Sequence, residues 1–252
     1  AGKSQLLYQP AERFSSPQTT PSNELLVSVS NFHQRNIKQL SLAEPSQPPK
    51  LLITSSFNDY GASIHINDGS QATAFISNRS GIKQLWFKED KRLRQLTHFS
   101  RNHQLADLQF SADSSQLLFT RDSQLLLLNI ANKEIKALTP EDHIINSPIW
   151  HCSKQETIIT SIRDQASWDL YKINIHSQAR TKVAPGIISI KSECHSGNYF
   201  ATQAHSKGIV TLDNLFTPLS PDKLLPQHYL SHSDEWANTE QGIYFVNEGE
   251  LY

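Results

Sequence analysis

Three arginines are the most regularly spaced residues that could do chemistry. Arg79, Arg121 and Arg163 are 42 residues apart each time (121 − 79 and 163 − 121), and each follows an apolar, strand-like run. A guanidinium is a permanent cation with a rigid fork of donors, so three at equivalent positions could form an anion-binding ring. The same regularity suits a structural brace repeated between neighbouring units. We favour the brace.

The 11 histidines raise the question of a metal site. Aligning the repeats brings His151 and His195 into register, each directly after a strand-like run, where both could face one mouth of a channel. His65 and His232 fall at other positions, and a metal site needs several ligands within reach of one another. We therefore expect no metal site, and we interpret His151 and His195 as solvated turn residues.

Nucleophilic catalysis finds no support, because the chain has no Gly-x-Ser-x-Gly sequence. The two cysteines, Cys152 and Cys194, lie near the same end of strand-like runs in adjacent repeats, so a disulfide is geometrically conceivable. We favour two independent, half-buried thiols. We expect a protein that is not an enzyme, with no catalytic residues and no cofactor, and the sequence singles out no binding residue.

Other conspicuous residues have structural interpretations. Asp68 and Asp113 occupy polar turns, where a short carboxylate caps backbone amides. The four tryptophans are expected in the core between repeats: Trp86, Trp150, Trp168 and Trp236.

The elements that position these residues follow from the same repeat. The pairs Leu96-Thr97 and Leu138-Thr139 recur at the 42-residue interval, and each unit holds several short strand-like segments. A period in the low forties with such segments predicts the blades of a β-propeller, because one four-stranded unit cannot bury both its faces alone. The 252 residues, 37% of them hydrophobic, suit one closed all-β domain.

Charge limits the partners of this segment. There are 23 basic and 24 acidic residues, giving a net charge of −1. Nucleic-acid affinity comes largely from neutralising phosphates, so we expect no direct nucleic-acid binding. No apolar run approaches the roughly 18 residues that a membrane helix needs, so any membrane attachment would come from a segment outside this chain.

We predict an all-β fold, a six-bladed β-propeller formed by a single domain over residues 1–252, with seven blades as the alternative. The first recognisable strand is Glu24–Ser30, and residues 4–14 are expected to close the ring as the outer strand of the last blade. The expected blades span about residues 15–60, 61–100, 101–142, 143–186, 187–230, and 231–252 with 4–14.

The repeat resembles the TolB-like WD-type repeats over essentially the whole chain. The matching residues are Ile66-Asn67-Asp68-Gly69, Ser77-Asn78-Arg79-Ser80-Gly81, Leu85-Trp86 and Leu96-Thr97, then Ser111-Ala112-Asp113, Thr120-Arg121 and Leu138-Thr139, and finally Ser161-Ile162-Arg163-Asp164. The fourth copy lacks the Leu-Thr pair. Such repeats occur in periplasmic Tol-Pal components, oligopeptidase propellers, oligogalacturonate lyases and the C-terminal sensor regions of membrane-anchored winged-helix regulators resembling CadC and ToxR.

This resemblance, with the absence of catalytic groupings, leads us to expect a recognition or sensor module. It would bind a protein, peptide or small-molecule ligand at a propeller mouth, on the periplasmic or extracytoplasmic side of the bacterial inner membrane. The DNA-binding domain of such a transcriptional regulator would lie outside this chain, and the oligomeric state is left open. The alternatives are a propeller enzyme or its gating domain, of polysaccharide lyase or oligopeptidase type, and a free Tol-type periplasmic scaffold.

Overall fold

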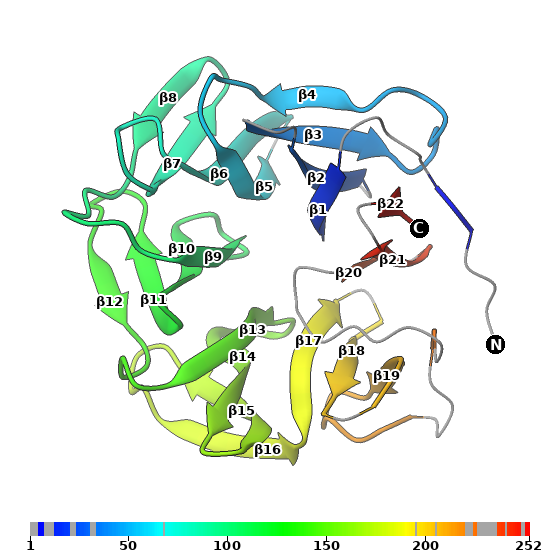
Figure 1. Ribbon diagram of the computed structural model, residues 1–252. Helices are drawn as coiled ribbons and strands as arrows, with labels where there is room; N and C mark the ends of the chain where they lie inside the picture. Colours follow the sequence, from blue (N-terminus) through cyan, green and yellow to red (C-terminus); the bar gives the residue numbers. More distant parts are fainter. Residues whose placement is uncertain are drawn as a thin grey trace.

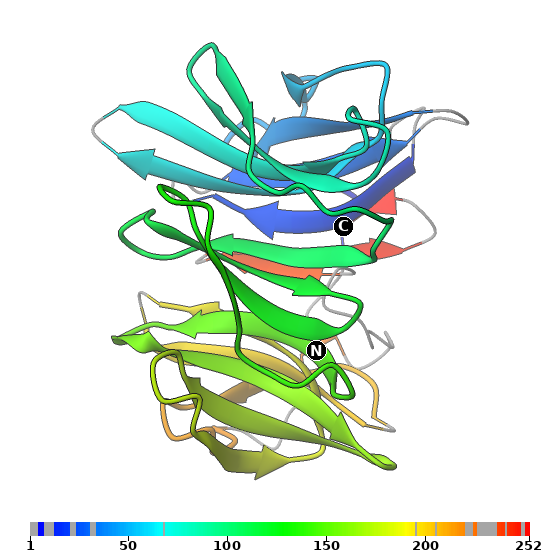
Figure 2. The same cartoon turned by 90° about the vertical axis from the view of Figure 1, so that its left-hand side faces the viewer.

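A computed structural model shows β-sheets arranged as the blades of a ring around a central axis (Figure 1). The structure describes residues 5–7, 13–20, 24–30, 34–67, 69–194, 196–204, 206–219, 224–225, 236–239, 241–247 and 250–252. Asp68, His195 and His232 lie outside the described residues. Figure 2 shows the ring from the side, with the twisted sheets of neighbouring blades packed on one another.

The described residues form six antiparallel sheets, which confirms the predicted six-bladed propeller. Blade 1 contains β1 (Arg13–Thr19), β2 (Glu24–Ser30), β3 (Arg35–Ser41) and β4 (Lys50–Ile53). Blade 2 contains β5 (Asp59–Asn67), β6 (Ser70–Ser77), β7 (Gln84–Glu89) and β8 (Arg92–Gln95). Blade 3 contains β9 (Leu105–Phe110), β10 (Gln116–Arg121), β11 (Gln124–Asn129) and β12 (Ile135–Ala137).

The remaining blades follow the same order. Blade 4 contains β13 (Ile144–His151), β14 (Lys154–Asp164), β15 (Ser167–Asn174) and β16 (Arg180–Pro185). Blade 5 contains β17 (Ile187–Glu193), β18 (Asn198–Gln203) and β19 (Ile209–Leu212), and blade 6 contains β20 (Trp236–Thr239), β21 (Gly242–Asn247) and β22 (Glu250–Leu251). The described residues include no helix that is long and apolar enough to span a membrane.

The inner strand of blade 1 differs from the sequence-based layout. The first strand of this blade is β1, which precedes the Glu24–Ser30 run, and its register shifts between Ser15 and Gln18, beside Pro17. A proline and three hydroxyl residues (Ser15, Ser16 and Thr19) hide the apolar alternation of a strand. Phe14, expected in the closing segment, is instead a residue of β1 and is buried in the cluster between blades 1 and 6.

The repeated Leu-Thr pairs tie the end of a blade's fourth strand to the start of its third, where Gln84-Leu85 and Gln124-Leu125 lie. The hydroxyl of Thr97 accepts a hydrogen bond from the Leu85 amide (2.9 Å) and donates one to the side-chain oxygen of Gln84 (2.7 Å). In blade 3, the Thr139 hydroxyl likewise accepts from the Leu125 amide (3.0 Å). In these two blades the repeated threonine therefore provides the hydrogen-bond partner for a backbone amide, at the point where the chain passes to the next blade.

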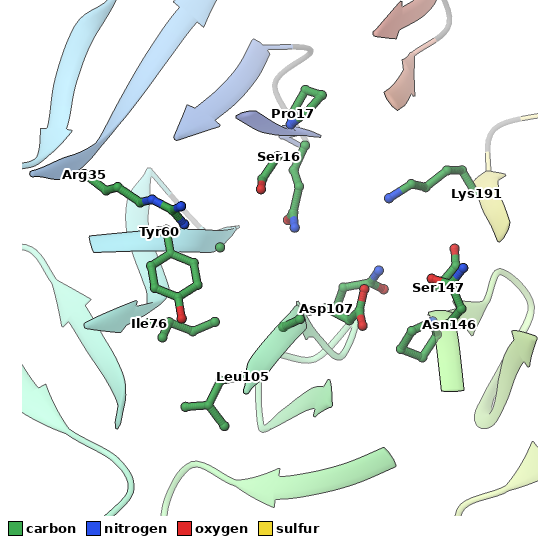
Figure 3. A pocket seen from close by; sticks show the side chains of 15 residues that line it. Ser16, Pro17, Arg35, Tyr60, Ile76, Leu105, Asp107, Asn146, Ser147 and Lys191 are labelled. Atoms are coloured by element: carbon green, nitrogen blue, oxygen red, sulfur yellow. The ribbon is translucent and has the colours of Figure 1, made fainter. Parts of the chain in front are cut away.

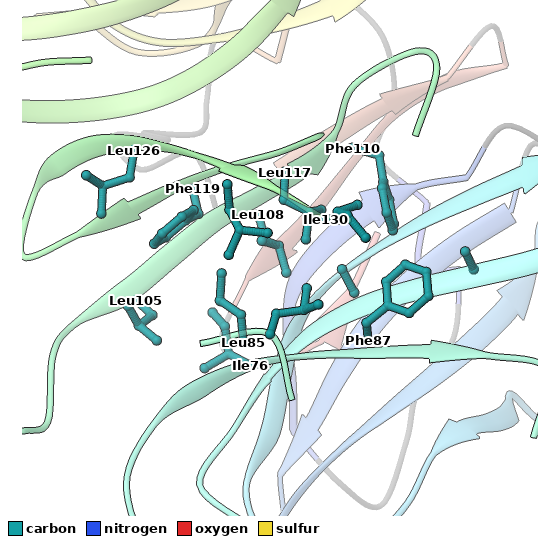
Figure 4. Packing of buried hydrophobic residues seen from close by; sticks show 14 residues of the cluster. Ile76, Leu85, Phe87, Leu105, Leu108, Phe110, Leu117, Phe119, Leu126 and Ile130 are labelled. Atoms are coloured by element: carbon teal, nitrogen blue, oxygen red, sulfur yellow. The ribbon is translucent and has the colours of Figure 1, made fainter. Parts of the chain in front are cut away.

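Blades pack face to face through apolar clusters, as Figure 4 shows for blades 2 and 3. There Ile76, Leu85 and Leu108 are fully buried, and Phe87 and Phe110 meet edge to face at 6.2 Å between ring centroids. Comparable clusters join the other neighbours around the ring. Trp236 is fully buried, Trp86 and Trp150 pack against clusters, and Trp168 is half-buried.

The ring closes by contact between the two ends of the chain. The backbone amide of Leu7 donates a hydrogen bond to the carbonyl of Leu251 in β22 (3.1 Å). Leu7 and Leu251 pack in one cluster with Phe14 of β1 and Ala237 of β20. Leu7, from the expected closing segment, thus lies beside the last strand of blade 6, whereas the end of that segment belongs to β1.

This closure makes a matched pair of substitutions informative. Leu7→Ala should lower the free energy of unfolding by about 1–2 kcal/mol, because it removes half-buried apolar surface between blades 6 and 1. Leu6→Ala, at a neighbouring side chain that is 39% exposed, should leave it unchanged. Thermal denaturation of both variants measures the difference, and equal melting curves would contradict the closure.

Candidate binding site at the mouth of the central channel

The inner strands of five blades surround a cavity of about 300 Å³ at the mouth of the central channel (Figure 3). Polar and charged side chains from different blades face it. These include Arg35, Tyr60, Asp107, Asn146, Ser147 and Lys191.

A bulge interrupts the inner strand of each of the first four blades at this mouth. The register shifts occur in β1, β5, β9 and β13. Each bulge holds one residue in the left-handed region, namely Ser16 (φ 52°), Gly61 (58°), Asp107 (55°) and Ser147 (54°). A bulge changes the direction in which the side chains of a strand point. A residue other than glycine in the left-handed region costs conformational energy, so it persists only where the surrounding structure compensates for that energy.

Gly61 shows how tightly a bulge can be packed. A Cβ atom at this position would lie 3.0 Å from Cδ1 of Ile76, in addition to the positive φ. Glycine is therefore required by both conformation and space.

Side-chain hydrogen bonds hold the bulges at Asp107 and Ser147 in place. The Thr120 hydroxyl donates to a carboxylate oxygen of Asp107 (2.9 Å). The Ile190 amide donates to the Ser147 hydroxyl (2.9 Å), which in turn donates to the Ile190 carbonyl. Asn146 donates from its amide to the Ile188 carbonyl (3.0 Å). The blade 4 side of the mouth is thus fastened to blade 5, which makes a rigid frame.

The two sides of the mouth carry different charges. On one side, the Arg35 guanidinium carbon lies 5.4 Å from the centroid of the Tyr60 ring. Burial raises the pKa of Tyr60, and Arg35 opposes that shift only in part, so the phenol stays protonated at neutral pH. Across the cavity lie the carboxylate of Asp107 and the ammonium of Lys191 (Figure 3).

The three regularly spaced arginines do not line this cavity and are not equivalent. Arg79 pairs with the fully buried carboxylate of Asp59 at 2.8 Å, so it braces the second strand of blade 2 to the start of its first. Arg121 stacks over Phe99, from the segment after blade 2, at 5.5 Å. Arg163 is exposed. The expected brace between neighbouring blades is therefore wrong for Arg79, which pairs within its own blade, and for the exposed Arg163.

Two expectations about the opposite ends of the inner strands were wrong. Cys152 and Cys194 form a disulfide that joins blades 4 and 5, rather than remaining as free thiols. His151 is buried, with its ring edge-on to Tyr199 at 6.3 Å, because it is the last residue of β13 rather than part of the solvated turn. Burial, followed by the charges of Lys172 and Lys154, lowers the pKa of His151.

The turn aspartate Asp113 behaves as expected. Its carboxylate accepts hydrogen bonds from the Ser111 hydroxyl (2.6 Å) and the Ser115 amide (3.1 Å). The Ser111 bond, with smaller contributions from Ser115, lowers the pKa of Asp113. His65 lies against Phe110 in the blade 2–3 interface. Within the part of the chain that the structure describes, no three His, Cys, Asp or Glu side chains lie close enough together to hold a metal ion.

None of the residues at the channel mouth was singled out by the sequence. A usable signal was present, because Ser16, Gly61 and Ser147 are small residues inside otherwise strand-like segments, and such interruptions mark bulges. Aligning them across blades would have directed attention to the inner strands near their beginnings.

Comparisons with known proteins agree with this architecture. No family model matches the chain, and no curated protein matches it. Among solved structures, TolB from Acinetobacter baumannii is 14% identical, with a TM-score of 0.65, over 86% of this chain and 57% of that one. The structure of a protein described as TolB from Agrobacterium tumefaciens is 13% identical, with a TM-score of 0.66, over 86% and 83%.

A third similar structure is an oligogalacturonate lyase in complex with manganese, 10% identical with a TM-score of 0.60 over 97% of this chain and 77% of that one. At such identities the likeness shows the fold alone. The chain has the architecture of the six-bladed β-propellers. Its fold is TolB-like, and it spans 57% of the length of the A. baumannii TolB chain.

Proposed function

We propose that this propeller is a non-catalytic recognition module that binds a protein, peptide or small-molecule ligand at the channel mouth. The observation that carries the proposal is the set of four aligned bulges, which present polar side chains around one cavity on a rigid frame. Binding sites are concave, largely preformed, and equipped with a few convergent polar groups. The bulges cost conformational energy that a purely structural inner strand would not need.

We further propose an extracytoplasmic location, as the sensor part of a bacterial membrane-bound transcriptional regulator. The disulfide between blades 4 and 5 supports an oxidising compartment, since such bonds persist outside the cytosol. The regulator assignment is supported by the resemblance of the repeats. The coding sequence around this chain tests it, because it should encode a basic winged-helix segment and one apolar stretch of about 20 residues. A hydrolase domain there would contradict it and favour the oligopeptidase type.

Binding at the mouth can be tested with a matched pair of variants. Ala106 is an exposed residue of β9 that lines the cavity, and Ala131 is exposed in the outer turn of the same blade. The protein would be titrated with short peptides and small acids, amines and sugars, while backbone amide chemical shifts are recorded. We expect ligand-induced shifts at the mouth that Ala106→Trp abolishes and Ala131→Trp preserves.

The same titration can refute the proposal. Shifts that cluster away from the mouth, or binding unaffected by Ala106→Trp, would place recognition elsewhere. Conversion of an added oligosaccharide into unsaturated products would instead establish a lyase.

A further inference from the structure

Arg35 is a cation that the fold presents to the cavity. Within the described residues Arg35, the first residue of β3, forms no ion pair, whereas Arg79, which follows β6, pairs with the carboxylate of Asp59. Its guanidinium lies on the Tyr60 ring and projects toward the cavity (Figure 3). An aromatic ring behind a guanidinium restricts its orientation and leaves the donor fork for an anion.

The remaining charges of the mouth limit the anion that would fit. Among the described residues that line the cavity, Arg35 and Lys191 are positive and Asp107 is negative, so the formal charges of these three side chains sum to one positive charge. A singly charged carboxylate matches this balance, whereas a phosphate dianion would meet more repulsion from Asp107. Asp107 and the Asn146 side chain offer acceptor oxygens to hydrogen-bond donors placed near such a carboxylate.

We propose that the mouth binds a ligand through one carboxylate held by the Arg35 fork, with hydrogen-bond donors of the ligand directed toward Asp107 and Asn146. This inference rests on the proposed function and names its ligand class. Two sources carry that chemistry: a free hydroxy or amino acid, and the C-terminal end of a peptide. The cavity, at about 300 Å³, is at the small end of ligand sites, so it accommodates the terminal part of a chain or a small acid.

The test compares four probes by chemical-shift titration: acetyl-trialanine, its C-terminal amide, lactate and inorganic phosphate. We expect acetyl-trialanine to bind about tenfold more tightly than its amide, the effect of losing one charge-assisted hydrogen-bond pair. Phosphate should bind more weakly than the carboxylates. Lactate binding as tightly as the peptide acid identifies the small-acid source, and weaker lactate binding identifies the chain end.

A matched arginine pair assigns the interaction. Arg35→Met should weaken acetyl-trialanine binding by about tenfold and erase the preference over the amide. Arg94→Met is the control, because Arg94 also stacks on an aromatic ring, that of Phe87 at 4.6 Å, but belongs to the outer strand of blade 2. It should change nothing.

Equal binding of acid and amide, no binding by any carboxylate probe, or no effect of Arg35→Met would overturn the inference. These outcomes are separable from failure of the proposed function. If neutral probes bind the mouth and Ala106→Trp blocks them, the recognition module stands while the carboxylate assignment falls.

Discussion

Replacing both cysteines, Cys152→Ser with Cys194→Ser, should lower the free energy of unfolding by about 4 kcal/mol. The bond links residues 42 positions apart, and cross-linking a loop of that length removes chain entropy from the unfolded state by about this amount. For a domain of this size the melting temperature should fall by about 8–16 °C, measured by thermal denaturation without reductant.

Reductant provides the control for this prediction. Reduction of the native protein should move its melting temperature toward that of the double variant, while the variant itself should not respond. A double variant as stable as the native protein would show that packing alone joins blades 4 and 5. That packing includes Tyr199, whose ring lies 4.9 Å from that of Phe216, and Ile149 of blade 4.

Arg79→Met should destabilise the protein by about 3–5 kcal/mol. The substitution leaves the Asp59 carboxylate, which is 0% exposed, without its ion-pair partner and with the Ser55 hydroxyl as its donor at 2.7 Å. Removing one member of a buried pair strands an uncompensated charge, which is the costly case. The Arg79 guanidinium also lies over the Phe75 and Trp86 rings, and methionine leaves an apolar side chain beside them, so the effect reports removal of the guanidinium rather than of packing volume. Denaturant unfolding measures it.

Arg163→Met is the matched control, because Arg163 occupies the same repeat position but is exposed. It should change stability by less than about 0.5 kcal/mol. Adding Asp59→Leu to Arg79→Met should recover much of the loss, since replacing both charges removes the stranded carboxylate. Equal losses for Arg79→Met and Arg163→Met would refute the distinction between them.

The propeller could be predicted from sequence because its repeated residues form hydrogen bonds with backbone groups at the same place in successive blades. Thr97 and Thr139 accept a hydrogen bond from equivalent backbone amides in blades 2 and 3. The fixed interval between the two Leu-Thr pairs therefore reflects the fixed length of a blade. The 42-residue interval between the arginines does not predict which contacts each of them makes. Arg79 and Arg163 share a period, but Arg79 pairs with a buried aspartate, Asp59, which is the first residue of β5 and is not among the repeated residues.

The channel mouth was harder to foresee for a related physical reason. Its residues are single positions on different inner strands, brought together by ring geometry rather than by proximity in the chain. The disulfide depended on a distance too, because Cα atoms 5.1 Å apart allow a bond that sequence spacing alone does not establish. His151 was predicted to lie in a solvated turn but is the last residue of the buried strand β13. The sequence does not fix the end of a strand to within one residue.

The bulged inner strands divide the mouth into positions that can and cannot be exchanged when its specificity is redesigned. Ser16, Gly61 and Ser147 set the path of the backbone, and branched residues there would disturb the scaffold before they altered selectivity. Gln18, Gln109 and Lys191 face the same cavity from ordinary backbone conformations. A combinatorial library restricted to the second group should yield folded proteins with new preferences, which makes this ring a ready host for engineered receptors.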